Sequence, residues 1–174
     1  MKKLFLLLIA AALALAAIGA LSEPDTAEAS AHIGDVAFSL SNEQSYYDVS
    51  YRYPDEFELE IREDDDPVRH ILRYRVDGYD PTAVGIVVSR ASGYTPEERL
   101  AEMAFIGDVT TEEINGATWA IGTAADASKR NVIVYACAAA EYTYTFSFST
   151  DYPADFDFAD FAAAFAREVI IGNQ

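Results

Sequence analysis

Residues 142–149 read Tyr-Thr-Tyr-Thr-Phe-Ser-Phe-Ser, an unbroken alternation of aromatic and hydroxyl side chains. Successive side chains of a β-strand point to opposite faces of its sheet. The period of two therefore predicts a strand with one buried aromatic face and one polar face. The expected architecture depends on this stretch, because it is the clearest strand signal in the chain.

The same alternation occurs upstream. Odd-numbered positions are apolar over residues 47–53 and 57–61, and the parity reverses over residues 68–76, after a charged break. Both patterns predict half-buried strands. A hairpin keeps the two apolar sets on one side only if odd positions pair with even ones. We expect this register to place Glu58 opposite an arginine, which agrees with the apolar pattern.

The remaining strands are predicted from apolar runs and a turn. Residues 84–88 and 132–140 are short continuous apolar runs, which are typical of central strands covered on both faces. Trp119 and Ile121 follow the turn pair Asn115-Gly116 and predict an edge or near-central strand.

Two helices interrupt the strands. Residues 95–98 read Thr-Pro-Glu-Glu, a capping box with proline at the first helical position. A closing helix is expected to begin near residues 155–157 and to bury Phe158, Phe161 and Phe165. Grouped strands with two helices predict an α+β fold, in which a predominantly antiparallel β-sheet is packed by a middle helix and a C-terminal helix.

The N-terminus has the pattern of an export signal. Two lysines precede an uncharged apolar run over residues 4–21, and small and acidic residues follow. Residues 1–22 are therefore expected to be a signal peptide, or alternatively a membrane anchor. Residues 23–35 are acidic and aperiodic and are expected to form a flexible tether, which leaves residues 36–174 as a single domain. In both cases the domain is expected outside the cytoplasm, secreted or anchored.

Composition narrows the classes of partner. The chain has 29 acidic residues and 12 lysines and arginines, a formal charge of −17. Such a surface repels phosphate backbones and argues against nucleic-acid or anionic-membrane binding. Membrane contact is expected only through an uncleaved N-terminal segment. Cys137 is the single cysteine, so no intrachain disulfide can form.

Four stretches resemble the Mog1/PsbP-like α/β/α sandwich domains. They are residues 51–59 (Tyr-Arg-Tyr-Pro-Asp-Glu-Phe-Glu-Leu), 93–98, 114–119 and 142–165, within a coverage of about residues 36–171. The resemblance implies a fold and a role as a secreted or lipid-anchored accessory domain. It implies no reaction, because the members share no catalytic set. The chain departs from many bacterial look-alikes in lacking a lipid-bearing cysteine after the apolar run.

One acidic turn is a candidate metal site. The adjacent carboxylates of Glu63, Asp64, Asp65 and Asp66 are oxygen ligands of the kind that Ca²⁺ prefers. Calcium takes six to eight oxygens, which one turn supplies poorly, and the EF-hand spacing is missing. The turn is interpreted as a solvated hairpin tip, with a weak calcium site as the alternative.

Tyrosines supply a second candidate site. Tyr46, Tyr47, Tyr79 and Tyr94 are the tyrosines expected to be exposed, and together they could bind a sugar or a peptide. Strand propensity and core filling explain most of the aromatic content without any ligand.

The other reactive residue types are expected in the core. His70 lies on an apolar strand face, and Cys137 lies between alanines in an apolar strand. No local catalytic, nucleotide-binding or paired-cysteine motif occurs, and no cofactor is expected.

These observations favour a non-catalytic extracytoplasmic domain that contacts another protein of the cell envelope. A cation- or glycan-binding module and a hydrolase with a non-local active site are the alternatives.

Overall fold

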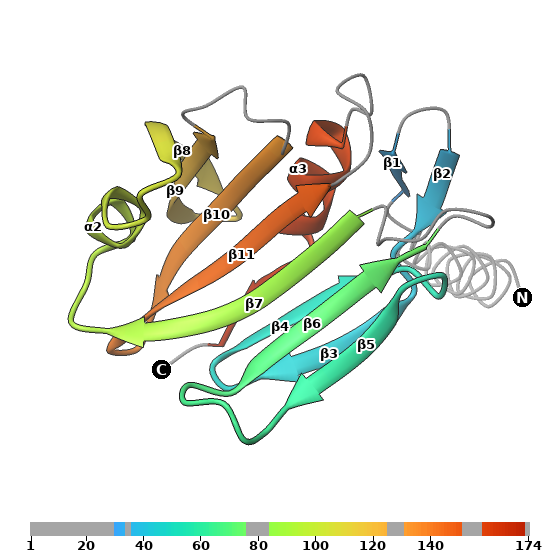
Figure 1. Cartoon of the computed structure of the whole chain (residues 1–174), viewed down its shortest axis with the longest axis horizontal. Coiled ribbons are helices and arrows are strands. Elements are labelled where there is room, and N and C mark those ends of the chain that lie inside the picture. The colour runs from blue at the N-terminus through green and yellow to red at the C-terminus, as the bar shows by residue number, and fades with distance from the viewer. Residues whose placement is uncertain (1–29, 34–35, 76–83, 125–130, 151–157, 173–174) are drawn as a thin grey trace, which may run out of the picture.

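The computed structural model describes residues 30–33, 36–75, 84–124, 131–150 and 158–172 (Figure 1). The strands of this part are β1 (Ser30–Ile33), β2 (Val36–Ser39), β3 (Asn42–Tyr46), β4 (Val49–Tyr53), β5 (Glu58–Arg62), β6 (Arg69–Tyr74), β7 (Val84–Ser92), β8 (Ile106–Ile114), β9 (Ala117–Ala124), β10 (Asn131–Ala139), β11 (Tyr142–Thr150) and β12 (Ile170–Ile171). The helices are α2 (Pro96–Ala101) and α3 (Ala159–Arg167).

The strands form three antiparallel sheets. A seven-stranded sheet has the order β5-β6-β7-β11-β10-β9-β8, a three-stranded sheet has the order β12-β4-β3, and β1 pairs with β2. The predicted strand over residues 142–149 is confirmed as β11, between β7 and β10. The predicted hairpin register is also confirmed, because Glu58 of β5 lies opposite Arg73 of β6.

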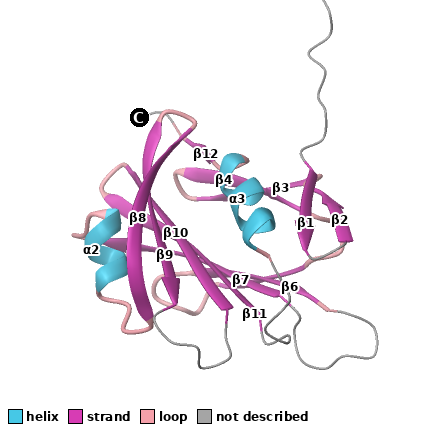
Figure 2. Ribbon diagram, turned by 90° about the horizontal axis from the view of Figure 1, so that it is seen from above, coloured by secondary structure: helices cyan, strands magenta, loops and turns pink. Residues whose placement is uncertain are grey.

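The two faces of the seven-stranded sheet differ in chemistry. On β11, Tyr144, Phe146 and Phe148 point to one side, and Thr143 and Thr145 point to the other. These sides are the aromatic face and the hydroxyl face of the sheet. The three-stranded sheet and α3 cover the aromatic face, and α2 lies on the hydroxyl face (Figure 2).

The main core lies on the aromatic face. Phe161 and Phe165 of α3 are fully buried, as the sequence pattern predicts. The Phe165 ring lies 5.3 Å from that of Phe148 and 5.5 Å from that of Tyr51, measured between centroids. The helix therefore joins the seven-stranded sheet to the three-stranded sheet through stacked and edge-on aromatic rings.

A smaller core lies under α2. The predicted capping box is confirmed: the Glu98 backbone N–H donates to the Thr95 hydroxyl, and the Glu98 carboxylate accepts from the Thr95 backbone N–H. Leu100, the buried residue of this helix, packs with Ala120, Val134 and Ala136 of β9 and β10.

The predicted α+β sandwich is wrong. Strands make up 62% of the described residues and helices 13%, so the fold is β-rich. The two helices contain six and nine residues and are too short to form a layer over seven strands. A second β-sheet takes the position that the α/β/α arrangement assigns to a helix, because the alternating pattern of residues 42–53 forms a hairpin of its own, β3–β4.

The predicted start of the domain also needs correction. Residues 30–33, assigned to the tether, form β1, and Ala31 and Ile33 are buried. Apolar side chains two residues apart make even this short segment a half-buried strand. Tyr47, assigned to a strand, lies instead in the β3–β4 turn with a φ of 52°.

Two predictions concern residues outside the described ranges. Residues 1–29 and 155–157 lie outside the described ranges, so neither the export signal nor the predicted start of the closing helix is addressed. Within the described ranges, no helix has the length and apolar character needed to cross a bilayer.

Candidate functional site

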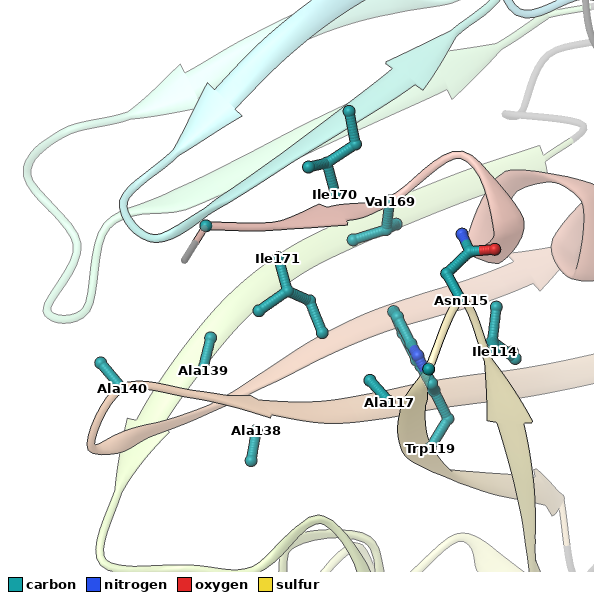
Figure 3. A pocket seen from close by; sticks show the side chains of 12 residues that line it. Ile114, Asn115, Ala117, Trp119, Ala138, Ala139, Ala140, Val169, Ile170 and Ile171 are labelled. Atoms are coloured by element: carbon teal, nitrogen blue, oxygen red, sulfur yellow. The ribbon is translucent and has the colours of Figure 1, made fainter. Parts of the chain in front are cut away.

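A cleft of about 530 Å³ opens where the three-stranded sheet meets the end of the seven-stranded sheet (Figure 3). This β12 cleft is lined by residues 114–117, Trp119, and residues 138–140 and 169–172. Its volume lies in the range of small-ligand pockets, about 300–1,000 Å³. No charged side chain is among the lining residues, in a chain whose formal charge is −17.

A tight turn holds one wall of the cleft. Asn115 and Gly116 join β8 to β9 with φ angles of 52° and 79°, which suit a type I′ hairpin turn. Glycine has no penalty in this left-handed region, and asparagine tolerates it. The Asn115 side-chain amide donates to the carbonyl oxygen of Arg167 at 2.6 Å. This bond fixes the turn to the end of α3, directly before the segment that forms the opposite wall.

Trp119 adds a second polar side-chain group to the lining of the cleft, besides the amide of Asn115. Its side chain is only 1% exposed and packs against Phe146, with 5.8 Å between ring centroids. Its indole Nε1 is buried and has no hydrogen-bond partner within the described part of the chain. A buried donor without an acceptor costs about 1–3 kcal/mol. The indole N–H is therefore a buried donor, on a residue that lines the cleft, without an acceptor among the described residues.

β12 presents an open backbone edge to the cleft. Among the described strands it lies at the edge of its sheet and pairs only with β4, with Ile170 opposite Ser50. The Gly172 N–H donates to the Asp48 carbonyl oxygen at 2.7 Å. Backbone groups of consecutive strand residues point to alternate sides, so the N–H and C=O of Ile171 point away from β4. The side of β12 away from β4 is the one that borders the cleft (Figure 3).

The acidic residues predicted as a calcium site lie in the turn between β5 and β6. Glu63, Asp64 and Asp66 are exposed. Asp65 accepts a hydrogen bond from Nε of Arg69 at 2.7 Å, so one of the four carboxylates is already paired. The described residues contain no group of three or more metal-ligating side chains arranged to hold an ion. Calcium binding stays a prediction.

The predicted tyrosine surface is not continuous. Tyr47 and Tyr94 are 52% and 37% exposed, whereas Tyr79 lies outside the described residues. The prediction that Tyr46 is exposed is wrong, because this side chain is 1% exposed. Its ring packs on His70, with 4.7 Å between centroids, and its hydroxyl donates to the carbonyl oxygen of Val68 at 2.5 Å.

His70 and Cys137 are core residues, as expected. The imidazole Nδ1 of His70 is hydrogen-bonded to the Tyr51 hydroxyl at 2.8 Å, and burial lowers the pKa of His70. Burial raises the pKa of the Cys137 thiol to about 12, so the thiol stays protonated at neutral pH.

The β12 cleft was not predicted from the sequence. The sequence pattern predicts the Asn115-Gly116 turn and the strand that carries Trp119, but it assigns a ligand-binding role to neither. The cleft needs three segments far apart in sequence, one of which is the two-residue strand β12. One sequence feature could have pointed to the cleft: Trp119, the single tryptophan of the chain, closely follows the Asn115-Gly116 turn. A buried indole usually has an acceptor for its N–H, so the surroundings of this residue are a reasonable place to look for a ligand.

No family model and no curated protein matches the chain. A crystal structure of a protein from Bacteroides thetaiotaomicron VPI-5482 is similar, with a TM-score of 0.50 and 12% sequence identity. The match covers 73% of this chain and 46% of the other, so this chain spans about half the length of that protein. At this identity the likeness concerns the fold alone. The resemblance to the Mog1/PsbP-like domains stays a prediction.

Proposed function

We propose that this protein is a non-catalytic binding domain that holds an extended apolar segment of a partner protein in the β12 cleft. The observation that carries the proposal is that, in the described part of the chain, the edge of β12 is open and the indole N–H of Trp119, which lines the same cleft, has no acceptor. The signal pattern of residues 1–22 supports a location outside the cytoplasm, where the partner is another protein of the cell envelope.

An extended peptide matches the chemistry of the cleft. An edge strand binds a further strand through main-chain hydrogen bonds, and neighbouring pockets select its side chains. Ile171 offers one N–H and one C=O to such a strand, and Trp119 offers a donor to a peptide carbonyl. Ile170 is 59% exposed and adds an apolar surface at the rim.

Charge favours a neutral or basic segment. The cleft lining is uncharged, whereas the chain carries a strong negative net charge. Burying an acidic side chain in the cleft would leave a charge without a partner, which is unfavourable. Basic residues that flank the bound segment would be attracted by the acidic surface.

Indole NMR tests this function directly. Trp119 is the single tryptophan, so the ¹⁵N-labelled protein has one indole N–H resonance. The probe is the acetylated and amidated hexapeptide Thr-Val-Thr-Val-Thr-Val. We expect the indole resonance to move and to saturate as this peptide is added. The same peptide with every backbone nitrogen methylated cannot donate to a strand edge and should leave the resonance in place.

Two alanines provide a matched pair of variants. Ala139 lines the cleft and points toward Ile171 (Figure 3), whereas Ala101 of α2 is exposed and is not a lining residue. Ala139→Leu should fill the cleft and weaken peptide binding about tenfold or more, and Ala101→Leu should leave binding unchanged. Equal binding of the methylated peptide, or equal loss in both variants, would contradict the proposed function.

A further inference from the structure

A second hollow, of about 760 Å³, lies over β7 on the hydroxyl face of the sheet. Its floor includes the odd-numbered residues Val87, Ser89 and Ala91 of β7. Three arginines and two aspartates also line it: Arg69, Arg90, Arg99, Asp65 and Asp66. This β7 groove is separated from the β12 cleft by the sheet itself and shares no lining residue with it.

The groove contains a row of polar side chains. His70 of β6 pairs with Val88 of β7, so Arg69 lies beside Ser89 in the next position of the register. Ser89 pairs in turn with Thr145 of β11, and their hydroxyl oxygens are 2.8 Å apart. When the Thr145 hydroxyl donates to Ser89, the O–H of Ser89 is free to donate to a ligand. Because Thr145 is only 1% exposed, this hydroxyl pair holds the Ser89 side chain in place.

Arg99 differs from the other arginines that line the groove. Arg69 donates to Asp65, and the guanidinium of Arg90 lies 3.4 Å from the Tyr47 ring centroid and 4.1 Å from that of Tyr142. Arg99 has only a longer aromatic contact, 5.9 Å from its guanidinium carbon to the Tyr94 ring centroid. It has no ion pair within the described residues, and its Nε is buried without an acceptor there. Burying a guanidinium nitrogen without a hydrogen-bond acceptor costs free energy. The missing acceptor is unexpected in a chain with 29 aspartates and glutamates.

We propose that the β7 groove binds a carboxylate, with Arg99 as the charged donor and the Ser89 hydroxyl as a second donor. The planar guanidinium matches the two oxygens of a carboxylate and binds them through paired N–H donors. The acidic surface of the chain disfavours polyanions, so the ligand has few charges. The carboxylate belongs either to a small organic acid or to an acidic side chain of a peptide.

Calorimetry of the full-length protein at low ionic strength tests the site with three probes. Succinate represents the free acid, and an acetylated and amidated Gly-Glu-Gly peptide represents the acidic side chain. Inorganic phosphate represents a different anion. Binding of either carboxylate probe at millimolar concentration supports the site and identifies the source of the ligand. Binding of neither probe overturns it, and tighter binding of phosphate than of both carboxylates overturns the ligand assignment.

Charge-matched variants separate the groove from a general charge effect. Arg99→Gln should weaken carboxylate binding about tenfold or more, because a charge-assisted hydrogen bond is lost. Arg52→Gln removes the same charge from β4, which lies beyond the aromatic face, and should leave binding unchanged. Ser89→Ala should weaken binding to a smaller extent. Equal affinities of the Arg99→Gln variant and the unaltered protein would overturn the proposal, provided both give the same circular dichroism spectrum.

Discussion

The aromatic face and the hydroxyl face of the seven-stranded sheet are both buried along β11, but for different reasons. Phe146 and Phe148 are 0% exposed beneath α3 and the three-stranded sheet, and Thr143 and Thr145 are 0% and 1% exposed on the other side. The phenylalanines are buried among other apolar rings, and the threonines are buried because their hydroxyls find partners in neighbouring segments. Burial alone therefore does not reveal which face stabilises the fold.

The two faces also differ in where they can accommodate a ligand. The aromatic face is packed throughout by large rings, and its cleft lies at the margin, where β12 ends the covering sheet. Among the described residues, the helix on the hydroxyl face is α2, with six residues, and the β7 groove lies on the same face. We expect stability to depend mainly on the first face, and carboxylate recognition to depend on the second.

The largest effect should come from the aromatic face. Phe146→Ala removes a fully buried ring whose centroid lies 5.8 Å from Trp119 and 6.0 Å from Phe165. Such truncations cost about 3–5 kcal/mol in the free energy of unfolding. Ser147→Ala, one position away on the hydroxyl face, should cost less than about 1 kcal/mol. Urea unfolding measures both, and similar losses would break the proposed distinction between the faces.

An intermediate effect should come from the hydroxyl pair. Thr145→Val keeps the shape of the side chain but leaves the Ser89 hydroxyl without its partner at 2.8 Å. We expect a loss of about 1–3 kcal/mol in unfolding free energy. Adding Ser89→Ala should recover part of that loss, because the unsatisfied group is then removed as well. If the double variant is as unstable as the sum of the single variants, the pair is not coupled.

His70 should make stability depend on pH. Burial lowers the pKa of His70 below its ordinary value of 6.5, so below pH 6.5 the unfolded chain binds more protons than the folded chain. The free energy of unfolding should therefore fall as the pH decreases from 6.5 through the lowered pKa. Urea midpoints at about pH 7.5 and about pH 5.5 measure this difference. His70→Gln should make the difference smaller, and an unchanged difference would assign the pH dependence to other groups.

The smallest effect should come from the exposed hairpin pair. Glu58→Lys places a positive charge opposite Arg73, and the side chain of Glu58 is 74% exposed. Like charges across a strand pair cost less than about 1 kcal/mol when solvent screens them. Glu58→Gln serves as the neutral control in thermal unfolding. A loss as large as that of Phe146→Ala would show that charge, and not apolar packing, fixes this register.

The features that could be predicted from the sequence are local ones. The alternation of β11, the odd-to-even register of β5 and β6, and the capping box at Thr95 each depend on residues close together in the chain. Each pattern also predicts a single backbone conformation, because alternation with a period of two fits a strand and a capping box fits the start of a helix.

The features that the sequence did not predict depend on distant segments. The assignment of residues 30–33 to a tether failed because Ile33 is buried only once α3 and β2 are in place. The α/β/α sandwich failed because the covering layer is a β-hairpin completed by β12 from the other end of the chain. The β12 cleft is missed for the same reason, since Trp119 and Ile171 meet only in the folded protein.

Hydrogen exchange at two adjacent amides tests the claim that β12 offers an open edge to an extended partner. The Gly172 N–H donates to Asp48 and should exchange slowly with or without ligand, whereas the Ile171 N–H should exchange fast in the free protein. Saturating Thr-Val-Thr-Val-Thr-Val peptide should slow exchange at Ile171 and leave Gly172 unchanged. Equal protection of the two amides in the free protein, or an Ile171 rate that the peptide does not alter, would contradict the claim.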